Sequence, residues 1–557
     1  HASVGTLHVR PILDMRRGGA RKMREIAEEA SALVRQYKGA YSGEHGDGLC
    51  RGEWVAWQFG ETLNDAFRAV KGAFDPQNLL NPGKIVDTPK MDDERYFRFP
   101  TRYQRIPLTP LFDWSAWNVT RDPLTGELGE PGSAGDATHG LAMAVEMCNN
   151  NGHCRKFDAG TMCPSYRITR DEQHLTRGRA NTLRLVLSGQ LGEQGLADDA
   201  VKEALDLCVS CKGCKRDCPT GVDMAKFKIE ARAARVRTKG LALRDRLIGE
   251  MPRYASWARR FAGLLGAVER LDFLARPLKQ ALGFAPQRRF PAFTGDFLGE
   301  CHGTPALASS AQTVGEVVLF VDTFSNYMES DNARAAKRVL EAAGYRVHLN
   351  VKPGERPLCC GRTYLSSGQF DKAKAEARRT LDALMPHVER GVAVVGLEPS
   401  CLLGMRDEFL QYGFGEQARA LADAAMLFEE FLVRARQAGE LSLDLKPLPG
   451  RALLHGHCHQ KAFDALRPVE QVLSWIPELT VETVDASCCG MAGSFGYEAE
   501  HYDASLQMAE LALLPAIREA DDDTVLVADG TSCRHQIRDG SGREAIHVAR
   551  LLERALA

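Results

Sequence analysis

The sequence has none of the features that would indicate export or membrane insertion. No apolar run reaches the roughly 18 residues of a membrane-spanning helix, and no secretory signal is visible. Net charge is also almost absent, because 71 Lys and Arg residues offset 73 Asp and Glu residues. No basic patch interleaved with aromatic residues occurs, which argues against a nucleic-acid partner. We expect a cytoplasmic chain without a transmembrane segment, at most peripheral at the inner membrane face.

The length and the cysteine content indicate several domains with metal or redox chemistry. A chain of 557 residues exceeds what one hydrophobic core usually supports, and 16 cysteines without a signal favour a reducing compartment. Because the chain starts at His1 inside an expected strand, we expect the C-terminal part of a longer protein. The expected segments are an α+β part (1–90), a linker (91–139), a helical cysteine-rich domain (140–235), a helical connector (236–314) and two α/β domains (315–440 and 450–557).

The two α/β domains are predicted from an internal repeat. EVVLFVD at 316, LCCGRTYLSSG at 358 and GVAVVGLEPSC at 391 recur as RALLHGHC at 451, SCCGMAGSFG at 487 and DTVLVADGTSC at 523. The offsets of 135, 129 and 132 residues indicate a duplicated domain. Short apolar strands alternating with amphipathic helices predict a parallel sheet in each copy. Cys401 and Cys533 would then lie beyond the carboxyl ends of strands, near helix N-termini that stabilise thiolates.

Four cysteines followed by proline form the most specific motif of the chain. The stretch DLCVSCKGCKRDCPTGVD contains Cys208, Cys211, Cys214 and Cys218. The spacing C-x2-C-x2-C-x3-C-P is the bacterial ferredoxin signature, in which three thiolates converge on one 4Fe-4S cubane. The fourth cysteine usually serves another cluster, and we expect it to start a helix. A structural zinc site is the alternative, although zinc sites usually pair C-x2-C units across a longer loop.

A looser run, CNNNGHCRKFDAGTMCPSY, supplies Cys148, Cys154 and Cys163. Cys163 again precedes proline and would complete the cubane held by the first three cysteines of the compact motif. Cys148 and Cys154, together with Cys218, would leave a second cluster one ligand short. That cluster then has a non-cysteine ligand, holds three irons, or is absent.

Two CCG units form a third kind of cysteine site. The first copy carries Cys359, Cys360 and Cys401, and the second carries Cys458, Cys488, Cys489 and Cys533. Adjacent cysteines do not easily join one tetrahedral site, so they suit a cluster of another shape, a redox thiol pair, or buried thiols without metal. In the first copy, Asp322 and Thr323 stand near the sequence position that Cys458 has in the second copy. This departure from the fuller pattern makes a metal site in the first copy doubtful. Cys50 and Cys301 have no partners nearby, and we expect ordinary thiols there.

A constellation of histidines near the start of the chain indicates a second chemistry. His1 and His8 lie seven residues apart, and the stretch SGEHGDG supplies Glu44 and His45. Two imidazoles and a carboxylate suit a divalent metal with open positions, and a histidine between glycines could approach a substrate closely as a general base. Arg10 shares a face with His8 if this segment is a strand.

These motifs carry a family resemblance. HASVGTLHVRP, GEHGDG and FDPQNLLNPGKI resemble the C-terminal end of FAD-linked oxidases of the vanillyl-alcohol oxidase type. The CCG units resemble the cysteine-rich domains of heterodisulfide reductase and of glycolate oxidase iron–sulfur subunits. In this order, over essentially the whole chain, the motifs are similar to the fused flavin and iron–sulfur D-2-hydroxy acid dehydrogenases, which include bacterial D-2-hydroxyglutarate and D-lactate dehydrogenases.

The resemblance implies roles for the first constellation. The implied ligands of a divalent metal such as zinc are His1, His8 and Glu44, and the implied base is His45. The GH pair that precedes the first histidine in the family is missing here, so His1 rests on spacing alone. Arg10 and Lys84 are candidates for contacts to the substrate carboxylate or the flavin, or are surface charges.

The resemblance also implies the reaction. A small D-2-hydroxy acid (D-2-hydroxyglutarate, D-lactate or glycolate) would be oxidised to the 2-oxo acid, and electrons would pass from FAD through 4Fe-4S clusters to a quinone, a cytochrome or a flavoprotein. The FAD-binding half normally precedes this part, so the chain alone is expected to be inactive. A non-catalytic electron-transfer subunit of the heterodisulfide-reductase or glycolate-oxidase type is the alternative. A homo-oligomer is compatible with either.

Overall fold

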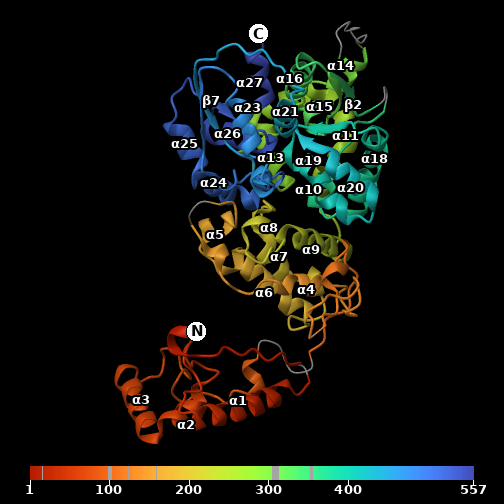
Figure 1. Cartoon of the computed structure of the whole chain (residues 1–557). Coiled ribbons are helices and arrows are strands. Elements are labelled where there is room, and N and C mark those ends of the chain that lie inside the picture. Colours follow the sequence, from red (N-terminus) through yellow and green to blue (C-terminus); the bar gives the residue numbers. More distant parts are fainter. Residues whose placement is uncertain (16, 98–102, 123, 158–159, 304–312, 352–354) are drawn as a thin grey trace. The chain divides into compact units, whose positions relative to one another are not determined.

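The computed structural model describes residues 1–557 except 16, 98–102, 123, 158–159, 304–312 and 352–354. Parts of the expected connecting segments 91–139 and 236–314 therefore lie outside the described residues. The chain forms two compact units, residues 1–105 and residues 106–557, which are shown in Figure 1. No helix among the described residues is both long and apolar enough to cross a bilayer.

The first unit contains only helices and loops among its described residues. Its α-helices are α1 (Gly19–Gln36), α2 (Val55–Phe59) and α3 (Glu61–Phe74). The helix expected from the apolar spacing of residues 20–37 is confirmed as α1. The strand expected at residues 6–13 is wrong, because this segment has no regular secondary structure and the described part of the unit contains no strand with which it could pair. A single extended segment without a neighbour leaves its backbone groups unpaired and forms no sheet.

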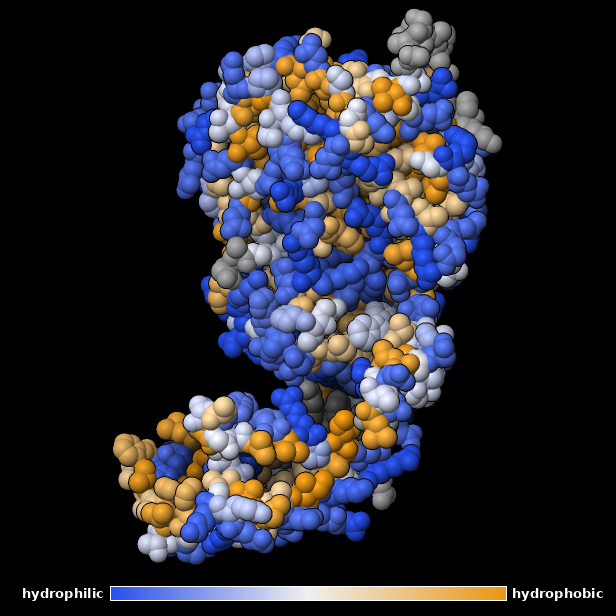
Figure 2. Space-filling view, viewed as in Figure 1, coloured by the Kyte–Doolittle hydropathy of each residue, from blue (hydrophilic) through white to orange (hydrophobic). Residues whose placement is uncertain are grey.

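Large apolar side chains lie on the surface of the first unit. Leu7, Ile12 and Phe74 are 90%, 94% and 84% exposed. Figure 2 shows hydrophobic residues gathered over much of the visible face of this unit. A contiguous apolar surface of this kind usually marks a place where another protein surface packs.

The second unit begins with a helical domain that carries seven cysteines. Its α-helices are α4 (Leu141–Glu146), α5 (Pro164–Thr169), α6 (Thr176–Leu187), α7 (Asp199–Asp206), α8 (Gly213–Asp217) and α9 (Met224–Lys239). Glu230 of α9 is buried and accepts hydrogen bonds from the amides of Leu111 and Phe112 and from the indole of Trp114. This carboxylate therefore anchors the preceding connecting segment on the domain.

Helices also dominate the connector that follows. They are α10 (Leu243–Gly249), α11 (Met251–Ala258), α12 (Ala262–Arg270), α13 (Asp272–Ala281) and α14 (Phe297–Gly303). Ala255 of α11 and Ala275 of α13 are buried, whereas Phe273 and Leu264 are mostly exposed. The connector is thus amphipathic but leaves several large apolar side chains uncovered.

The predicted duplication is confirmed by two sheets of the same topology. The first contains β1 (Gly315–Phe320), β2 (Tyr345–Leu349), β3 (Ala393–Gly396) and β4 (Ala425–Leu427) in the order β2-β1-β3-β4. The second contains β5 (Gly450–Leu454), β6 (Leu479–Thr483), β7 (Val525–Val527) and β8 (Ala545–Ile546) in the order β6-β5-β7-β8. All paired strands are parallel, as the alternation of strands and helices predicts.

Helices cover both sheets. In the first copy they are α15 (Thr323–Tyr327), α16 (Ser330–Ala342), α17 (Arg362–Ser366), α18 (Phe370–Val388), α19 (Pro399–Met405), α20 (Glu416–Ala424) and α21 (Phe428–Gln437). In the second copy they are α22 (Cys458–Ala462), α23 (Arg467–Leu473), α24 (Tyr502–Glu510), α25 (Leu513–Glu519), α26 (Thr531–Ser541) and α27 (Val548–Ala555).

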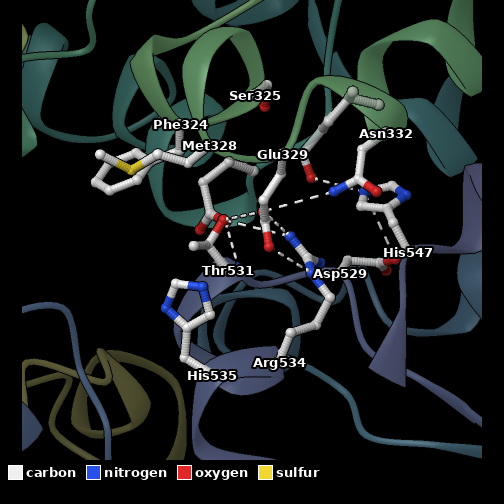
Figure 3. A network of polar contacts seen from close by, with 12 residues as sticks. Phe324, Ser325, Met328, Glu329, Asn332, Asp529, Thr531, Arg534, His535 and His547 are labelled. Carbon is white, nitrogen blue, oxygen red and sulfur yellow. Dashed lines mark hydrogen bonds and ion pairs between the residues drawn. The ribbon is translucent and has the colours of Figure 1, made fainter. Parts of the chain in front are cut away.

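A polar network joins the two copies. Figure 3 shows Glu329, at the start of α16, facing Arg534 and Thr531 of α26. Arg534 Nε donates to Glu329 Oε1 at 2.9 Å, and Thr531 Oγ1 donates to Glu329 Oε2 at 2.6 Å. Burial opposes ionisation of Glu329, but the adjacent Arg534 outweighs burial and lowers the pKa of Glu329 to about 2.

Candidate functional site

The predicted histidine constellation forms one cluster in the first unit. One ligand atom from each of His1, His8, Glu44 and His45 lies within 4.8 Å of the others. His8 Nδ1 is 2.9 Å from Glu44 Oε1, while His45 Nε2 and His1 Nε2 are 2.6 Å and 3.6 Å from Glu44 Oε2. Glu44 Oε2 has no aligned hydrogen bond and is buried. Three imidazoles around an incompletely satisfied carboxylate fit a divalent cation such as zinc.

The loop that carries Glu44 and His45 reaches this cluster because of its local sequence. A Cβ on Gly43 would lie 2.3 Å from Thr6 Oγ1, so a larger residue here would require the Thr6 side chain to shift. His45 has a φ of 59°, a conformation uncommon for a residue with a side chain. Arg51 supports the loop by donating to the carbonyl oxygen of Gly46 at 2.6 Å.

The other two residues predicted for this site are less defined. Arg10 has an exposed side chain and Lys84 is partly buried. Neither residue's contact with a carboxylate or flavin is tested by this structure, so both roles stay predictions.

In the second unit, four predicted cluster ligands line a single small cavity. They are Cys163, Cys208, Cys211 and Cys214, and all four are buried. Two features bring the separate segments together. Asp217 accepts hydrogen bonds from the amides of Thr161 and Met162, and a Cβ on Gly213 would lie 2.9 Å from the carbonyl carbon of Thr161.

The chemistry of this cavity fits an iron–sulfur cluster. Burial raises the pKa of Cys163, and it raises the pKa values of Cys211 and Cys214 well above the ordinary value. Buried thiols of this kind lose their protons on binding metal. The guanidinium of Arg179 lies beside Cys163, and Lys228 lies beside Cys208. Cationic neighbours of this kind stabilise thiolate ligands.

The remaining three cysteines of the domain are less closely gathered. Burial raises the pKa of Cys154 to about 11, and its thiol interacts with Cys148. Cys218 lies at the C-terminal end of α8, so the expectation that it starts a helix is wrong, and the next helix begins five residues after Pro219. Its Sγ is 3.3 Å from Thr220 Oγ1. The three thiols stay a candidate for an incomplete second set.

The second CCG copy gathers its thiols around an imidazole that the sequence motifs did not single out. Ligand atoms of His455, Cys489 and Cys533 lie within 4.8 Å of one another, and all three residues are buried. Neither ring nitrogen of His455 has an aligned hydrogen bond. A hydrogen bond from Cys488 lowers the pKa of Cys458 to about 6, and contacts with Cys488 and Cys533 hold the pKa of Cys489 well below its ordinary value.

The first CCG copy has a different electrostatic environment. Cys360 Sγ donates to Cys401 Sγ at 3.0 Å. This hydrogen bond lowers the pKa of Cys401, but burial and the carboxylates of Asp322 and Glu398 raise it on balance to about 12. Of the described groups of three or more potential ligands, none includes a thiol of this copy. Asp322 instead caps α15, accepting from the amides of Phe324 and Ser325.

The four-cysteine cavity (Cys163, Cys208, Cys211 and Cys214) and the second copy are in direct contact. Helix α8 packs against α22, and Cys211, Cys458 and Cys488 belong to the same buried cluster. His459 Nε2 is 3.1 Å from the carbonyl oxygen of Ser210. A continuous path of packed groups therefore joins the two sets of thiols. The sequence does contain a hint of His455 and His459, because both lie in the stretch HGHCH at residues 455–459. Histidines beside a single cysteine do not reveal, however, which of them faces a cluster.

Buried charges fix the first copy to the loop of the four-cysteine cavity, and sequence reasoning also missed them. Lys212 lies between Cys211 and Cys214 and is 1% exposed. Its Nζ is 2.7 Å from Asp407 Oδ2 and 2.7 Å from Glu408 Oε1. Nothing local in the sequence links residues almost two hundred positions apart.

Three family models match the chain. The FAD linked oxidases, C-terminal domain model matches residues 1–85, the 4Fe-4S dicluster domain model matches residues 144–222, and the cysteine-rich domain model matches residues 320–406 and 452–538. Each model matches its own part of the chain, and none covers half of it. The matches confirm the fold class and the family resemblance expected from the motifs, and they support FAD and iron–sulfur clusters as cofactors.

Similar proteins cover nearly the whole chain. It is 27% identical over 99% of its length to D-2-hydroxyglutarate dehydrogenase from Escherichia coli (strain K12), and 29% identical over 98% to the protein of that name from Pseudomonas putida. It spans 55% and 54% of those two relatives, about half their length. It is also 26% identical, over 74% of its length, to 94% of the glycolate oxidase iron-sulfur subunit of Escherichia coli (strain K12).

Proposed function

We propose that this chain is part of a flavin- and iron–sulfur-dependent enzyme that oxidises a D-2-hydroxy acid to the 2-oxo acid. The substrate candidates are D-2-hydroxyglutarate, D-lactate and glycolate, and the names of the long relatives favour the first. The observation that carries the proposal is the cluster of three histidines around Glu44, because an electron-transfer subunit has no use for it.

Each residue of the cluster has a task in this reaction. His1, His8 and Glu44 hold a divalent metal, and His45 takes the proton of the substrate hydroxyl group. His45 is more than half exposed, so it can reach a substrate and return the proton to water. When bound, the metal supplies a Lewis acid for the hydroxyl oxygen, FAD accepts the hydride, and iron–sulfur clusters carry single electrons. The exposed apolar side chains of the first unit support packing against a flavin-binding part.

The cysteines serve electron transfer in this proposal. Cys163, Cys208, Cys211 and Cys214 hold one 4Fe-4S cluster, and Cys148, Cys154 and Cys218 contribute to a second. The second CCG copy holds a metal or cluster with His455 as an additional ligand, and the first copy holds none. All sixteen cysteines are free, which supports a cytoplasmic location.

One other function has support. The chain spans 94% of a glycolate oxidase iron-sulfur subunit, so residues 106–557 could act purely in electron transfer. In that case the histidine cluster would have no catalytic task.

Steady-state kinetics of the full-length protein with each of the three hydroxy acids tests the proposal. His45→Gln is expected to lower kcat by about 100-fold or more, with metal content unchanged, because general-base catalysis contributes at least that much. His139→Gln is the matched control, since His139 is also exposed and has a φ of 52°. We expect no turnover from residues 1–557 alone. Equal kcat for both variants would contradict the assigned base, and full-length protein inert toward all three acids would favour the electron-transfer subunit.

A further inference from the structure

A large apolar cavity lies in the second unit and shares no residue with the histidine cluster. Its volume is about 1230 Å³, and helices α10 to α13 form one wall. This wall presents Leu247, Met251, Trp257, Phe261, Leu265 and Leu278. Small-ligand pockets usually measure about 300–1,000 Å³, so this cavity has room for a ligand with a long tail. An empty apolar space of this size would forfeit packing contacts, and water is poorly held there.

The inner end of the cavity reaches the redox thiols. Cys208 of the four-cysteine cavity and Cys458 and Cys488 of the second CCG copy line it. Two cationic or polar side chains lie at the same end. Lys228 donates to the carbonyl oxygen of Cys208, and the ring of His501 stacks on Phe495 with centroids 4.3 Å apart.

His501 is held in place by two carboxylates. Its Nδ1 is 2.8 Å from Glu498 Oε2, and its Nε2 is 3.4 Å from Asp206 Oδ2. Because these carboxylates engage the imidazole, the group suited to donate to a carbonyl oxygen of a bound molecule is the ammonium group of Lys228, which has three donors and uses one on Cys208.

The outer end of the cavity opens among exposed apolar side chains. Trp257, Leu264 and Leu278 line the cavity, yet they are 61%, 63% and 54% exposed. Arg253 and Arg276, on α11 and α13, are also exposed. Apolar side chains bordered by arginine are typical of surfaces that contact lipid headgroups and acyl chains.

We propose that this cavity binds a lipid-soluble quinone, which accepts the electrons of the proposed reaction. The tail would lie along α10 to α13, and the ring would lie at the thiol-lined end. The proposal rests on the proposed function, which supplies the reductant. The hydroxy acid loses its C2 hydrogen and its hydroxyl proton to form a C=O bond, giving up two electrons and two protons. The quinone takes up two electrons and two protons, so that both of its carbonyl groups become hydroxyl groups of a quinol.

Other occupants fit less well. A hydroxy acid is small, so it would leave most of the apolar lining of this cavity without contact. A peptide would leave backbone polar groups unpaired against the leucine and phenylalanine side chains. A quinone brings only two carbonyl oxygens, so the rest of its surface suits the largely apolar lining.

Binding can be measured without turnover, through the fluorescence of Trp257. Decyl-ubiquinone is added to the full chain in detergent, and 2,3-dimethoxy-5-methyl-1,4-benzoquinone, which lacks the tail, serves as the comparison. We expect saturable quenching by decyl-ubiquinone, reduced in Trp257→Phe, and much weaker binding of the compound without the tail. Quenching that does not saturate, or equal binding of both compounds, would overturn the proposal.

Two leucines of α13 provide a matched pair of variants. Leu278 lines the cavity and Leu274 does not, although they are 54% and 45% exposed. Leu278→Glu is expected to weaken decyl-ubiquinone binding by about tenfold or more, and Leu274→Glu by less than about twofold. Leu265→Glu, on α12, repeats the test if Leu278→Glu does not fold. If Leu278→Glu, Leu265→Glu and Leu274→Glu all bound decyl-ubiquinone with equal affinity, the proposed site would be overturned.

The outcome also separates this site from the proposed function. Full-length protein that reduces an artificial dye with a hydroxy acid, but does not bind decyl-ubiquinone, would overturn the quinone site and leave the proposed function intact. Saturable, Leu278-dependent binding in a protein that oxidises no hydroxy acid would support the site and overturn the proposed function.

Discussion

The two CCG copies have the same strand order, but the second has four cysteines where the first has three, and only the second contains thiols with a lowered pKa. In the first copy the pKa values of all three thiols are raised, whereas in the second those of Cys458 and Cys489 are lowered and those of Cys488 and Cys533 are raised. The residue that begins the helix after the first strand is Asp322 in one copy and His457 in the other. Hydrogen bonds from neighbouring thiols are the largest cause of the lowered pKa values, and His457 adds a smaller effect on Cys458, whereas Asp322 helps to raise the pKa of Cys401.

This difference indicates a division of labour between the two copies. The second copy contacts the four-cysteine cavity and contains thiols with a lowered pKa, so it is suited to hold a metal. The first copy has three thiols rather than four and is anchored by buried charges around Asp407. The following predictions test that division, from the largest expected effect to the smallest.

The largest effect concerns metal content. Cys489→Ser is expected to remove the metal held by the second copy, while Cys360→Ser, its counterpart in the first copy, leaves total iron, zinc and acid-labile sulfide unchanged. Metal and sulfide analysis of the reconstituted chain measures both variants. Equal metal content in the two variants would mean that the copies do not differ in this way.

The next effect concerns how each copy is anchored. Burial opposes ionisation of Asp407, but three lysines outweigh burial and hold its pKa well below the ordinary value. Asp407→Asn would leave Lys212 buried beside Glu408 alone, and we expect a loss of about 3–5 kcal/mol in unfolding free energy.

The counterpart in the second copy is Asp539, whose Oδ2 is 3.3 Å from Arg288. Arg288 keeps its hydrogen bonds to Gly496 and Ser505, so Asp539→Asn should cost only about 1 kcal/mol. Urea unfolding compares the two variants. If Asp539→Asn lowered the unfolding free energy more than Asp407→Asn, the predicted difference between the copies would be contradicted.

The third effect is a pH dependence at the junction between the copies. The folded-state pKa of Glu329 is about 2, below the ordinary value of 4.5. Because the folded pKa is depressed, the stability from this carboxylate is fully present above pH 4.5 and is lost as the pH falls toward 2. Glu329→Gln should therefore cost about 2–3 kcal/mol at pH 7 and progressively less in acid.

Glu510→Gln is the control for that measurement, since Glu510 pairs with Arg518 on the surface. It should change stability little at any pH. Chemical unfolding at several pH values tests both variants. A cost of Glu329→Gln that stays constant down to pH 2 would contradict the ion pair.

The smallest effect concerns the helix cap that replaces the fourth thiol. Asp322→Ala removes the acceptor for two amides of α15 and should lower stability by about 1 kcal/mol, whereas Asp322→Asn keeps a capping oxygen and should lower it much less. Thermal unfolding of the two variants measures the difference. If both variants were equally stable, Asp322 would not act as a cap.

Local patterns predicted much of the fold. The helical spacing of residues 20–37 gave α1, and the recurring strand, turn and cysteine units gave two parallel sheets, because each of these signals lies within a short stretch. The strand at residues 6–13 was a wrong prediction, since alternation cannot supply the neighbour that a strand needs. Cys218 was wrongly expected to start a helix, because a proline permits a helix start but does not require one.

The sequence alone therefore determined the kinds of chemistry in this protein. The ferredoxin spacing, the paired CCG units and the histidines around GEHGDG are local, and a thiol or imidazole keeps its ligand chemistry in any fold. Only the tertiary structure decided which groups act together. It brought His455 to Cys489, Lys212 to Asp407, and the helices of the connector over the redox thiols. Acidity, burial and cavity shape depend on neighbours from distant segments, and no short stretch of sequence specifies them.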